Sequence, residues 1–365
     1  MSERADVVIC GAGVIGASVA YNLALRGIAS VVVERVAVAH GASGTAAGLL
    51  TPVPPSQESS PVGQLATRSM ECHRYLAEEL DGRNQYDFAE VEALVVATSA
   101  AERRFLEDAY GKERVMAPPD RNGWLDREVA GAVAVEGAAQ IHPGKYTRTL
   151  LEAACAMGAR VVQGDVQGIR TERGRVTAVL VSAETVETSR VVVAMGPWSA
   201  EAEAWLRMPV PVTPLKGQIL HYAMRDAPEG LFSTLDGNYA VRKPDGVVFA
   251  GTTEEEAGFD LSPTDEARDG IGKWVSSVSS RFDGQMPVGQ TVCLRPLSED
   301  GLPLIGAVPT FEGAYIAAGH GRKGLMLSAA TGELLTELIA TGVCTSMDLG
   351  PFDPGRFRTM PRSLA

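Results

Sequence analysis

The first candidates for chemistry are three glycines near the start of the chain, Gly11, Gly13 and Gly16, which follow the spacing G-x-G-x-x-G. Between a strand and a helix, the first glycine permits a tight turn, the second lets the backbone approach a pyrophosphate, and the third allows close helix–strand contact. The helix N-terminus directs N–H groups and the positive end of its dipole at the anion. Glu34 stands where an acidic side chain can accept hydrogen bonds from an adenosine ribose, and it disfavours a ribose 2′-phosphate. These residues predict a dinucleotide site, but the glycines alone do not separate FAD from NAD.

The residues around the glycines supply the elements that must position them. The apolar run at 7–10 predicts a buried parallel strand, residues 14–26 predict a helix, and the β-branched run at 30–34 predicts a second strand. The order is that of a βαβ unit, so the glycine turn falls at the carboxyl end of a strand, where nucleotides bind in such sheets.

Beyond the βαβ unit, the sequence pattern indicates mainly antiparallel strands. Residues 166–171, 175–181 and 188–194 predict a three-stranded meander, and a Pro-Asp-Gly turn predicts a hairpin over 239–250. A last helix is expected over 324–340, returning to the first domain. A chain of 365 residues exceeds what one hydrophobic core usually serves, so two domains are expected.

Composition restricts the classes of partner and compartment. The formal net charge of −12 argues against nucleic acid and anionic membrane surfaces, and no apolar run is long enough for a membrane span. The N-terminus shows no cleavable signal segment, so we expect a cytoplasmic protein. The five cysteines are scattered and never form a C-x-x-C pair, so neither a disulfide framework nor a metal site is expected.

Four blocks of sequence carry a resemblance that covers nearly the whole chain. They are residues 6–34, ASGTAAGLL at 42–50, VVVAMGPWS at 191–199 with PLKGQ at 214–218, and CLRPLSEDGLPLIG at 293–306 continuing through AGHGRKG at 318–324 to 331–332. They resemble the glycine oxidase branch of the D-amino acid oxidase (DAO) family of FAD-dependent amine oxidoreductases, which implies FAD as the cofactor. The residues agree with this, because a loop of Ala, Ser and Gly can lie flush on a flat aromatic ring, and a glycine-rich turn before a helix offers backbone donors to the pyrimidine oxygens of a flavin.

The resemblance also implies the fold and its division. We expect an α/β (α+β two-domain) protein: a Rossmann-like FAD-binding domain with an interleaved antiparallel-sheet substrate domain. The FAD-binding domain is expected to be discontinuous, from residues 1–80, 140–210 and 285–345. The substrate-binding domain would comprise 81–139 and 211–284.

The cofactor contacts implied by the motif and the resemblance extend along most of the chain. They comprise Gly11, Gly13, Val14, Ile15, Gly16, Glu34, Arg35, Ala42, Ser43, Ala46, Ala47, Gly48, Leu49, Val166, Gly196, Trp198, His320, Gly321, Arg322, Lys323, Gly324 and Leu325.

Four residues are candidates for binding the substrate. Arg295 lies between apolar neighbours and resembles the family's carboxylate-binding arginine; a structural ion pair is the alternative. Tyr239 resembles the tyrosine that hydrogen-bonds the substrate carboxylate, although a tyrosine in a sheet is commonly a packing residue. Arg322 resembles a second active-site arginine, with a surface or flavin-edge role as the alternative. Leu49 replaces a methionine that glycine oxidases often carry beside the substrate.

Cys293 raises the question of a covalent flavin link. A cysteine near this place joins the flavin in the related monomeric sarcosine oxidases, but the chain lacks the basic residues of their flavin loop, and a buried cysteine is usually a small core residue. A non-covalent flavin is therefore expected.

The function that the resemblance implies is FAD-dependent oxidative deamination of a small amino acid: glycine, sarcosine or a D-amino acid. Hydride passes to flavin N5, the imine is hydrolysed, and electrons go to O2 or another acceptor. One alternative is a flavoprotein subunit of a multi-subunit amino-acid or proline dehydrogenase complex, and another is an RNA-modifying flavoprotein, against which the acidic charge argues. The expected partners are therefore a small-molecule substrate and, as a protein partner, either a second copy of the chain or another dehydrogenase subunit.

Overall fold

A six-stranded sheet forms the centre of one half of the molecule. The computed structural model describes residues 3–358 except 117–123, 126–128 and 183. Four of the five pairings in this sheet are parallel, and only β19 runs antiparallel to its neighbour. The order is β19 (Leu304–Ala307), β20 (Ala314–Ala318), β13 (Val191–Val193), β2 (Val7–Cys10), β3 (Ser30–Glu34) and β9 (Arg160–Gln163).

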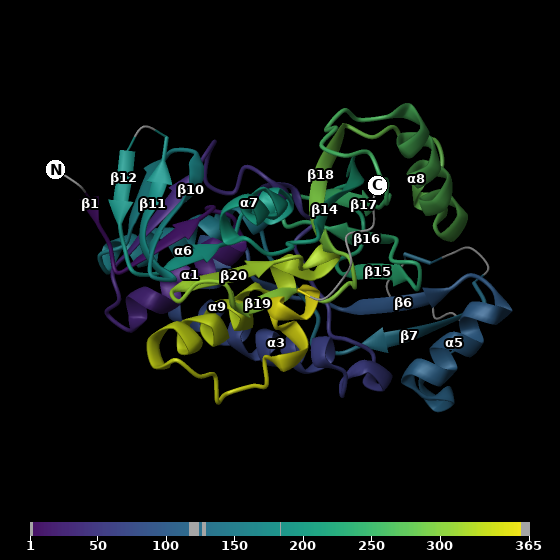
Figure 1. Cartoon of the computed structure of the whole chain (residues 1–365). Coiled ribbons are helices and arrows are strands. Elements are labelled where there is room, and N and C mark those ends of the chain that lie inside the picture. Colours follow the sequence, from purple (N-terminus) through teal and green to yellow (C-terminus); the bar gives the residue numbers. More distant parts are fainter. Residues whose placement is uncertain (1–2, 117–123, 126–128, 183, 359–365) are drawn as a thin grey trace.

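Helices cover one face of this sheet because their apolar residues face it and one another. α1 (Val14–Leu25) packs between α6 (Pro143–Ala156) and α9 (Gly324–Thr341), and α3 (Pro61–Glu79) packs on α9 (Figure 1). The sequence marks the ends of these helices. Ser60 Oγ accepts the Gly63 N–H ahead of α3, and α9 ends at Gly342 in the left-handed region (φ 82°).

A four-stranded sheet, β1-β12-β11-β10, lies beyond the other face (Figure 1). β10 (Val166–Glu172) and β11 (Arg175–Val181) match the first two strands of the predicted meander, but the third is β12 (Glu184–Glu187), which pairs in parallel with β1 (Glu3–Arg4). The expectation of a single strand over 188–194 was wrong. Thr188 Oγ1 accepts the Arg190 N–H and makes a turn there, after which Val191–Val193 enters the six-stranded sheet.

The second half of the molecule is built on a seven-stranded, mostly antiparallel sheet. Its strands alternate buried and partly exposed residues less regularly than a one-sided sheet, because α5 (Ala100–Tyr110) and α8 (Asp265–Val278) also pack on it. The order is β18 (Gly289–Ser298), β14 (Val212–Ala223), β17 (Val247–Gly251), β16 (Tyr239–Arg242), β15 (Leu231–Thr234), β6 (Ala93–Ala97) and β7 (Gly131–Val135).

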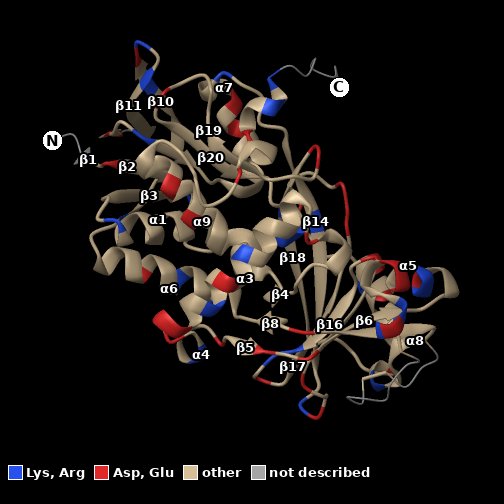
Figure 2. Ribbon diagram, turned by 90° about the horizontal axis from the view of Figure 1, so that it is seen from below, with Lys and Arg blue, Asp and Glu red and all other residues tan. Residues whose placement is uncertain are grey.

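Short elements join the two halves. A three-stranded sheet consists of β4 (Leu49–Leu50), β8 (Ala139–Gln140) and β5 (Ala89–Glu90). The remaining short helices are α2 (Ala42–Thr45), α4 (Gly82–Gln85) and α7 (Glu203–Leu206). Charged residues gather on outer helices such as α4 and α5 and in loops, while the central strands are mostly uncharged (Figure 2).

The structure confirms the predicted α/β class with a βαβ unit at the N-terminus and a separate antiparallel sheet. The strands at Val7–Cys10 and Ser30–Glu34, the hairpin of β16 and β17, and the last helix occur as expected. β18 lies within the 285–345 segment expected for the cofactor domain, yet it pairs with β14 in the seven-stranded sheet. The two expected units therefore share this strand as a common boundary.

The crossing of α1 and α9 depends on a glycine. A Cβ atom on Gly332 would lie 2.2 Å from Ser18 Oγ and 2.6 Å from the Ser18 carbonyl carbon, so Gly332→Ala should lower the free energy of unfolding by roughly 1–3 kcal/mol. Chemical denaturation measures this change. Gly270→Ala in α8 is the matched control, because its Cβ meets nothing within 4 Å, and helix propensity should raise stability by about 0.5–1 kcal/mol. Equal effects of the two substitutions would contradict this packing.

Candidate active site

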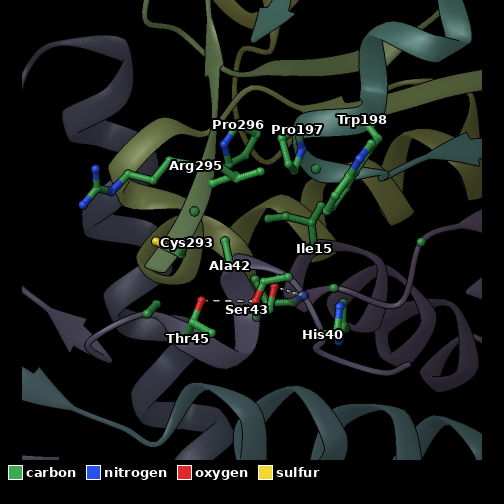
Figure 3. Close-up of a pocket in the computed structure, with 18 of the residues that line it drawn as sticks. Ile15, His40, Ala42, Ser43, Thr45, Pro197, Trp198, Cys293, Arg295 and Pro296 are labelled. Carbon is green, nitrogen blue, oxygen red and sulfur yellow. Dashed lines mark hydrogen bonds between the residues drawn. The ribbon is translucent and has the colours of Figure 1, made fainter. Parts of the chain in front are cut away.

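A long cleft of about 570 Å³ runs from the carboxyl ends of β2 and β3 to the face of β14 and β18. Its walls come from segments far apart in sequence, including the glycine turn, the 40–49 loop, residues 194–198 and the turn before α9. Figure 3 shows Arg295 and Cys293 on one ribbon segment, with Trp198 and His40 towards the opposite end. A cleft of this shape suits an elongated ligand.

The glycine turn forms one end of the cleft. Gly11 has φ 108°, and a Cβ atom there would lie 2.4 Å from the Ala194 carbonyl oxygen; a Cβ on Gly16 would lie 2.0 Å from the Gly11 oxygen. The Val14 N–H at the start of α1 donates to Ser43 Oγ at 2.9 Å, which ties the glycine turn to α2. Gly11 and Gly16 thus permit the tight turn between β2 and α1, which places the start of α1 at this end of the cleft.

Glu34 lies at the same end of the cleft. Its carboxylate accepts the Ala12 and Val36 N–H groups, both at 2.9 Å, so it braces the turn. Each oxygen of a carboxylate has two lone pairs, so Glu34 retains acceptor capacity towards the cleft for a ribose hydroxyl.

Arg35 and Trp198 form a stacked wall next to Glu34. The Arg35 guanidinium lies 5.4 Å from the Trp198 ring centroid, and Phe259 stacks on Trp198 at 5.7 Å. Arg35 also forms exposed ion pairs with Asp165 at 3.7 Å and Glu201 at 3.5 Å. Phe259 therefore brings the 252–264 segment of the second half over the cofactor side of the cleft.

The small-residue loop at 42–49 lines the middle of the cleft. Gly48 has φ 81°, and a Cβ atom there would lie 2.0 Å from the Ile141 carbonyl oxygen. Lys243 Nζ donates to the Ala47 carbonyl at 2.9 Å, and burial lowers the pKa of Lys243 to about 8. The loop is therefore held from behind by a buried lysine that no sequence motif indicated.

The turn before α9 closes the cleft from the other side. His320 is buried, and its Nε2 contacts Thr331 Oγ1 at 3.1 Å. Burial lowers the pKa of His320 to about 3, so the ring is neutral, and its Nδ1 has no partner within the described chain. Gly324 then starts α9, and the first two residues of this helix, Gly324 and Leu325, line this part of the cleft.

Arg295 defines the far end of the cleft. The side chain is 8% exposed and lies over Gly217, where a Cβ atom would meet the guanidinium nitrogen Nη2 at 2.2 Å. Nη1 donates to the Thr253 carbonyl at 2.9 Å and Nη2 to Thr252 Oγ1, so its partners within the described residues are neutral. Arg295 is therefore a buried cation in the cleft with no carboxylate partner among the described residues, and a group of this kind can bind an anion.

Tyr239 and Arg322 complete this end. Burial raises the pKa of Tyr239, so its hydroxyl remains protonated, and both Arg295 and Arg322 are close enough to oppose that shift. Arg322 is more exposed: Nη1 pairs with Glu254 Oε1 at 3.1 Å, and the guanidinium also donates to the Asp236 and Gly237 carbonyls. The two arginines that the sequence singled out thus have different surroundings.

Cys293 lies two residues before Arg295 and lines the cleft. Its side chain is buried, and burial raises the pKa of the thiol, with partial relief from Arg295 and from a hydrogen bond with Thr45. A thiol with a raised pKa is a poor nucleophile at neutral pH.

The structure brings nearly all predicted site residues into one cleft. Gly16 and Lys323 do not line it: Gly16 contacts the glycine turn from behind, and Lys323 follows the Arg322 turn. Sequence reasoning missed Thr45, Ile219, Thr252 and Gln290, which also line the cleft. Thr252 holds Arg295 from a strand end with no motif, so only its place after the β16–β17 hairpin could have pointed to it.

Two further observations bear on the class of protein. Within residues 3–358 and outside the gaps, no cluster of three or more His, Cys, Asp or Glu side chains is arranged to hold a metal ion. In that same part of the chain no helix combines the length and apolar character that crossing a membrane requires.

Comparison with known proteins agrees with this geometry. The DAO family, described as FAD dependent oxidoreductase, matches residues 6–338, and the chain belongs to this family. More particularly, it is 31% identical to a glycine oxidase of Pseudomonas aeruginosa over 97% of this chain and 99% of the relative. It is 29% identical to the hydrogen cyanide synthase subunit HcnC of the same organism, over 100% and 99% of the two chains. The crystal structure of glycine oxidase from Geobacillus kaustophilus superposes with a TM-score of 0.90 at 28% identity, covering 97% of this chain and 99% of the other.

The protein is therefore an FAD-dependent amino acid oxidase or dehydrogenase of the glycine oxidase type. The residues present fit FAD. Gly11 and Gly13 line the cleft where α1 begins, and the N-terminus of a helix suits a pyrophosphate. Glu34 retains acceptor capacity for a ribose, and the unpartnered Nδ1 of His320 together with the N-terminus of α9 offers polar contacts to a ring system.

The geometry at Cys293 predicts a non-covalent flavin. Purified protein should be yellow, and acid precipitation should release the colour into the supernatant, because the buried thiol is protonated. Absorbance of the two fractions measures this. Colour that stays in the wild-type pellet but leaves the pellet of Cys293→Ser would overturn the prediction.

Proposed function

We propose that this enzyme oxidatively deaminates a small amino acid (glycine, sarcosine or a D-amino acid). The observation that carries the proposal is the buried Arg295 guanidinium, which has only neutral partners among the described residues and faces the cleft that fits FAD. A carboxylate is the natural ligand for such a group, because the planar guanidinium fork matches it in two parallel hydrogen bonds.

The division of labour follows from the surroundings of each residue. FAD supplies the hydride acceptor, flavin N5. Arg295 binds the substrate carboxylate, and Tyr239, protonated because of its raised pKa, donates a hydrogen bond to it. Leu49, Ile219 and Cys293 provide apolar walls that exclude water, and this anchoring directs the α C–H of the substrate towards the flavin.

Little acid–base catalysis is required of the protein. The substrate must react with its amine neutral, and Tyr239 is a poor base because its pKa is raised. His320 is neutral but hydrogen-bonded to Thr331. Positioning is therefore the main contribution of the chain, and the imine product is hydrolysed by water with release of ammonia or an amine.

The electron acceptor separates two versions of this function. In the first, O2 reoxidises the flavin and peroxide is formed. In the second, the chain is the flavoprotein subunit of a dehydrogenase complex, which the relative named as a subunit of hydrogen cyanide synthase supports. Peroxide formation by the isolated chain favours the first version; a stoichiometric second polypeptide, with poor peroxide formation without it, favours the second. The cysteines, all free among the described residues, favour the cytoplasm for either.

Arg295 offers the direct test of the substrate class. Arg295→Ala should lower kcat/KM for the best amino-acid substrate by roughly two to three powers of ten, because the substrate loses its carboxylate anchor, while the protein remains yellow. Arg295→Lys keeps the charge but loses the fork, so its KM should still rise strongly.

Two controls make this test specific. An amine without a carboxylate should be oxidised about as poorly by Arg295→Ala as by the wild type, and Arg83→Ala, on α4 outside the cleft, should keep full activity. Wild-type kcat/KM in Arg295→Ala would move carboxylate binding elsewhere and make Arg322 the next candidate.

A further inference from the structure

We propose that Glu254 is a specificity-determining residue that restricts the site to amino acids with one carboxylate. A second carboxylate, on the side chain or on the amine substituent, would meet the negative charge of Glu254, which is paired with the cleft residue Arg322. This inference rests on the proposed amino-acid oxidation and adds the class of substrate that the site rejects.

The first step of the argument is that Arg322 is already occupied. Its Nη1 lies 3.1 Å from Glu254 Oε1 and 3.3 Å from the Asp236 carbonyl oxygen, and its Nη2 donates to the Gly237 carbonyl. Both terminal nitrogens thus have protein acceptors, and the charge of Arg322 is compensated by Glu254. Arg322 is not free to bind a carboxylate as Arg295 is.

The second step is that one short segment sets the state of both arginines. Thr252 and Thr253 give Arg295 neutral oxygens, whereas Glu254, the next residue, gives Arg322 a carboxylate. The segment therefore leaves a net positive charge at one guanidinium and cancels it at the other. A cleft with two uncompensated arginines would accept a dicarboxylate; this one retains a single anion receptor.

The third step is the depth at which each pair lies. Arg295 is 8% exposed, whereas the side chains of Arg322 and Glu254 are 35% and 46% exposed. Tyr239 lies within electrostatic reach of both arginines, so the Arg322 pair is near the group that we propose binds the substrate carboxylate. Arg322 lines the same cleft as Arg295, so the distal group of a substrate held at Arg295 can approach the more exposed Arg322–Glu254 pair.

The size of the effect follows from this exposure. Charges a few ångströms apart interact appreciably at the protein surface, but solvent screens a pair that is about 40% exposed. We therefore expect Glu254 to change the relative use of mono- and dicarboxylates by roughly tenfold rather than by several powers of ten.

The test compares sarcosine with iminodiacetate, two secondary amines that differ by one carboxylate. The wild type should prefer sarcosine. In Glu254→Gln, which removes the charge at nearly constant shape, the ratio of kcat/KM for iminodiacetate over sarcosine should rise roughly tenfold, mainly through KM. Glu256→Gln is the matched control, because Glu256 is an exposed acid two residues further on, and its ratio should stay at the wild-type value.

The outcomes separate this inference from the proposed function. A wild type that prefers iminodiacetate, or an unchanged ratio in folded, yellow Glu254→Gln, would overturn it. If neither amine is oxidised, the affinities of acetate and malonate are measured by flavin absorbance instead. The affinity ratio of malonate over acetate should rise in Glu254→Gln but not in Glu256→Gln, and an unchanged ratio there would equally reject the role of Glu254.

Discussion

The buried charge of Arg295 is the constraint on which the substrate end of the cleft depends. Burying a guanidinium is unfavourable unless its N–H groups are hydrogen-bonded. In this chain the acceptors are the Thr253 carbonyl and Thr252 Oγ1 rather than a carboxylate. The guanidinium can lie flat against β14 only because residue 217 is glycine. The antiparallel pairing of β14 and β18, with Leu215 opposite Arg295 and Gly217 opposite Cys293, creates that space. The sheet thus positions a buried cation whose partners among the described residues are neutral.

The same strand links substrate binding to the cofactor end. β18 contributes Cys293, Arg295 and Pro296 to the cleft, and Leu297 forms a bridge with His320 just before α9 begins. From the other side, Lys243 of the second half donates to the Ala47 carbonyl in the 42–49 loop. The two halves are therefore joined at the places where they line the cleft, so the positions of Arg295, the glycine turn and the start of α9 are fixed relative to one another.

The sequence predicted the structural features that depend on local patterns of residues. The G-x-G-x-x-G turn and the strands beside it depend on neighbouring residues, so spacing located them, whereas the turn before α9 was found through the family resemblance. Arg295 and Tyr239 were found through their resemblance to a family and not through local physics. The partners of the two arginines could not be predicted, because Thr252, Thr253 and Glu254 approach them through tertiary folding. The strand at Val191–Val193 was merged with a meander because a short buried run has no periodicity of its own.

The central claim, that Arg295 is the anion receptor of the cleft, can be measured without turnover. Glycolate has the carboxylate of glycine but no amine, and its binding can be followed by the change in flavin absorbance under anaerobic conditions. The wild type should show a saturable change, and Arg295→Ala, still yellow, should bind glycolate roughly a hundredfold more weakly, as expected for the loss of a bidentate charged hydrogen bond. Equal affinities in the two proteins would contradict the account and place the carboxylate at another group.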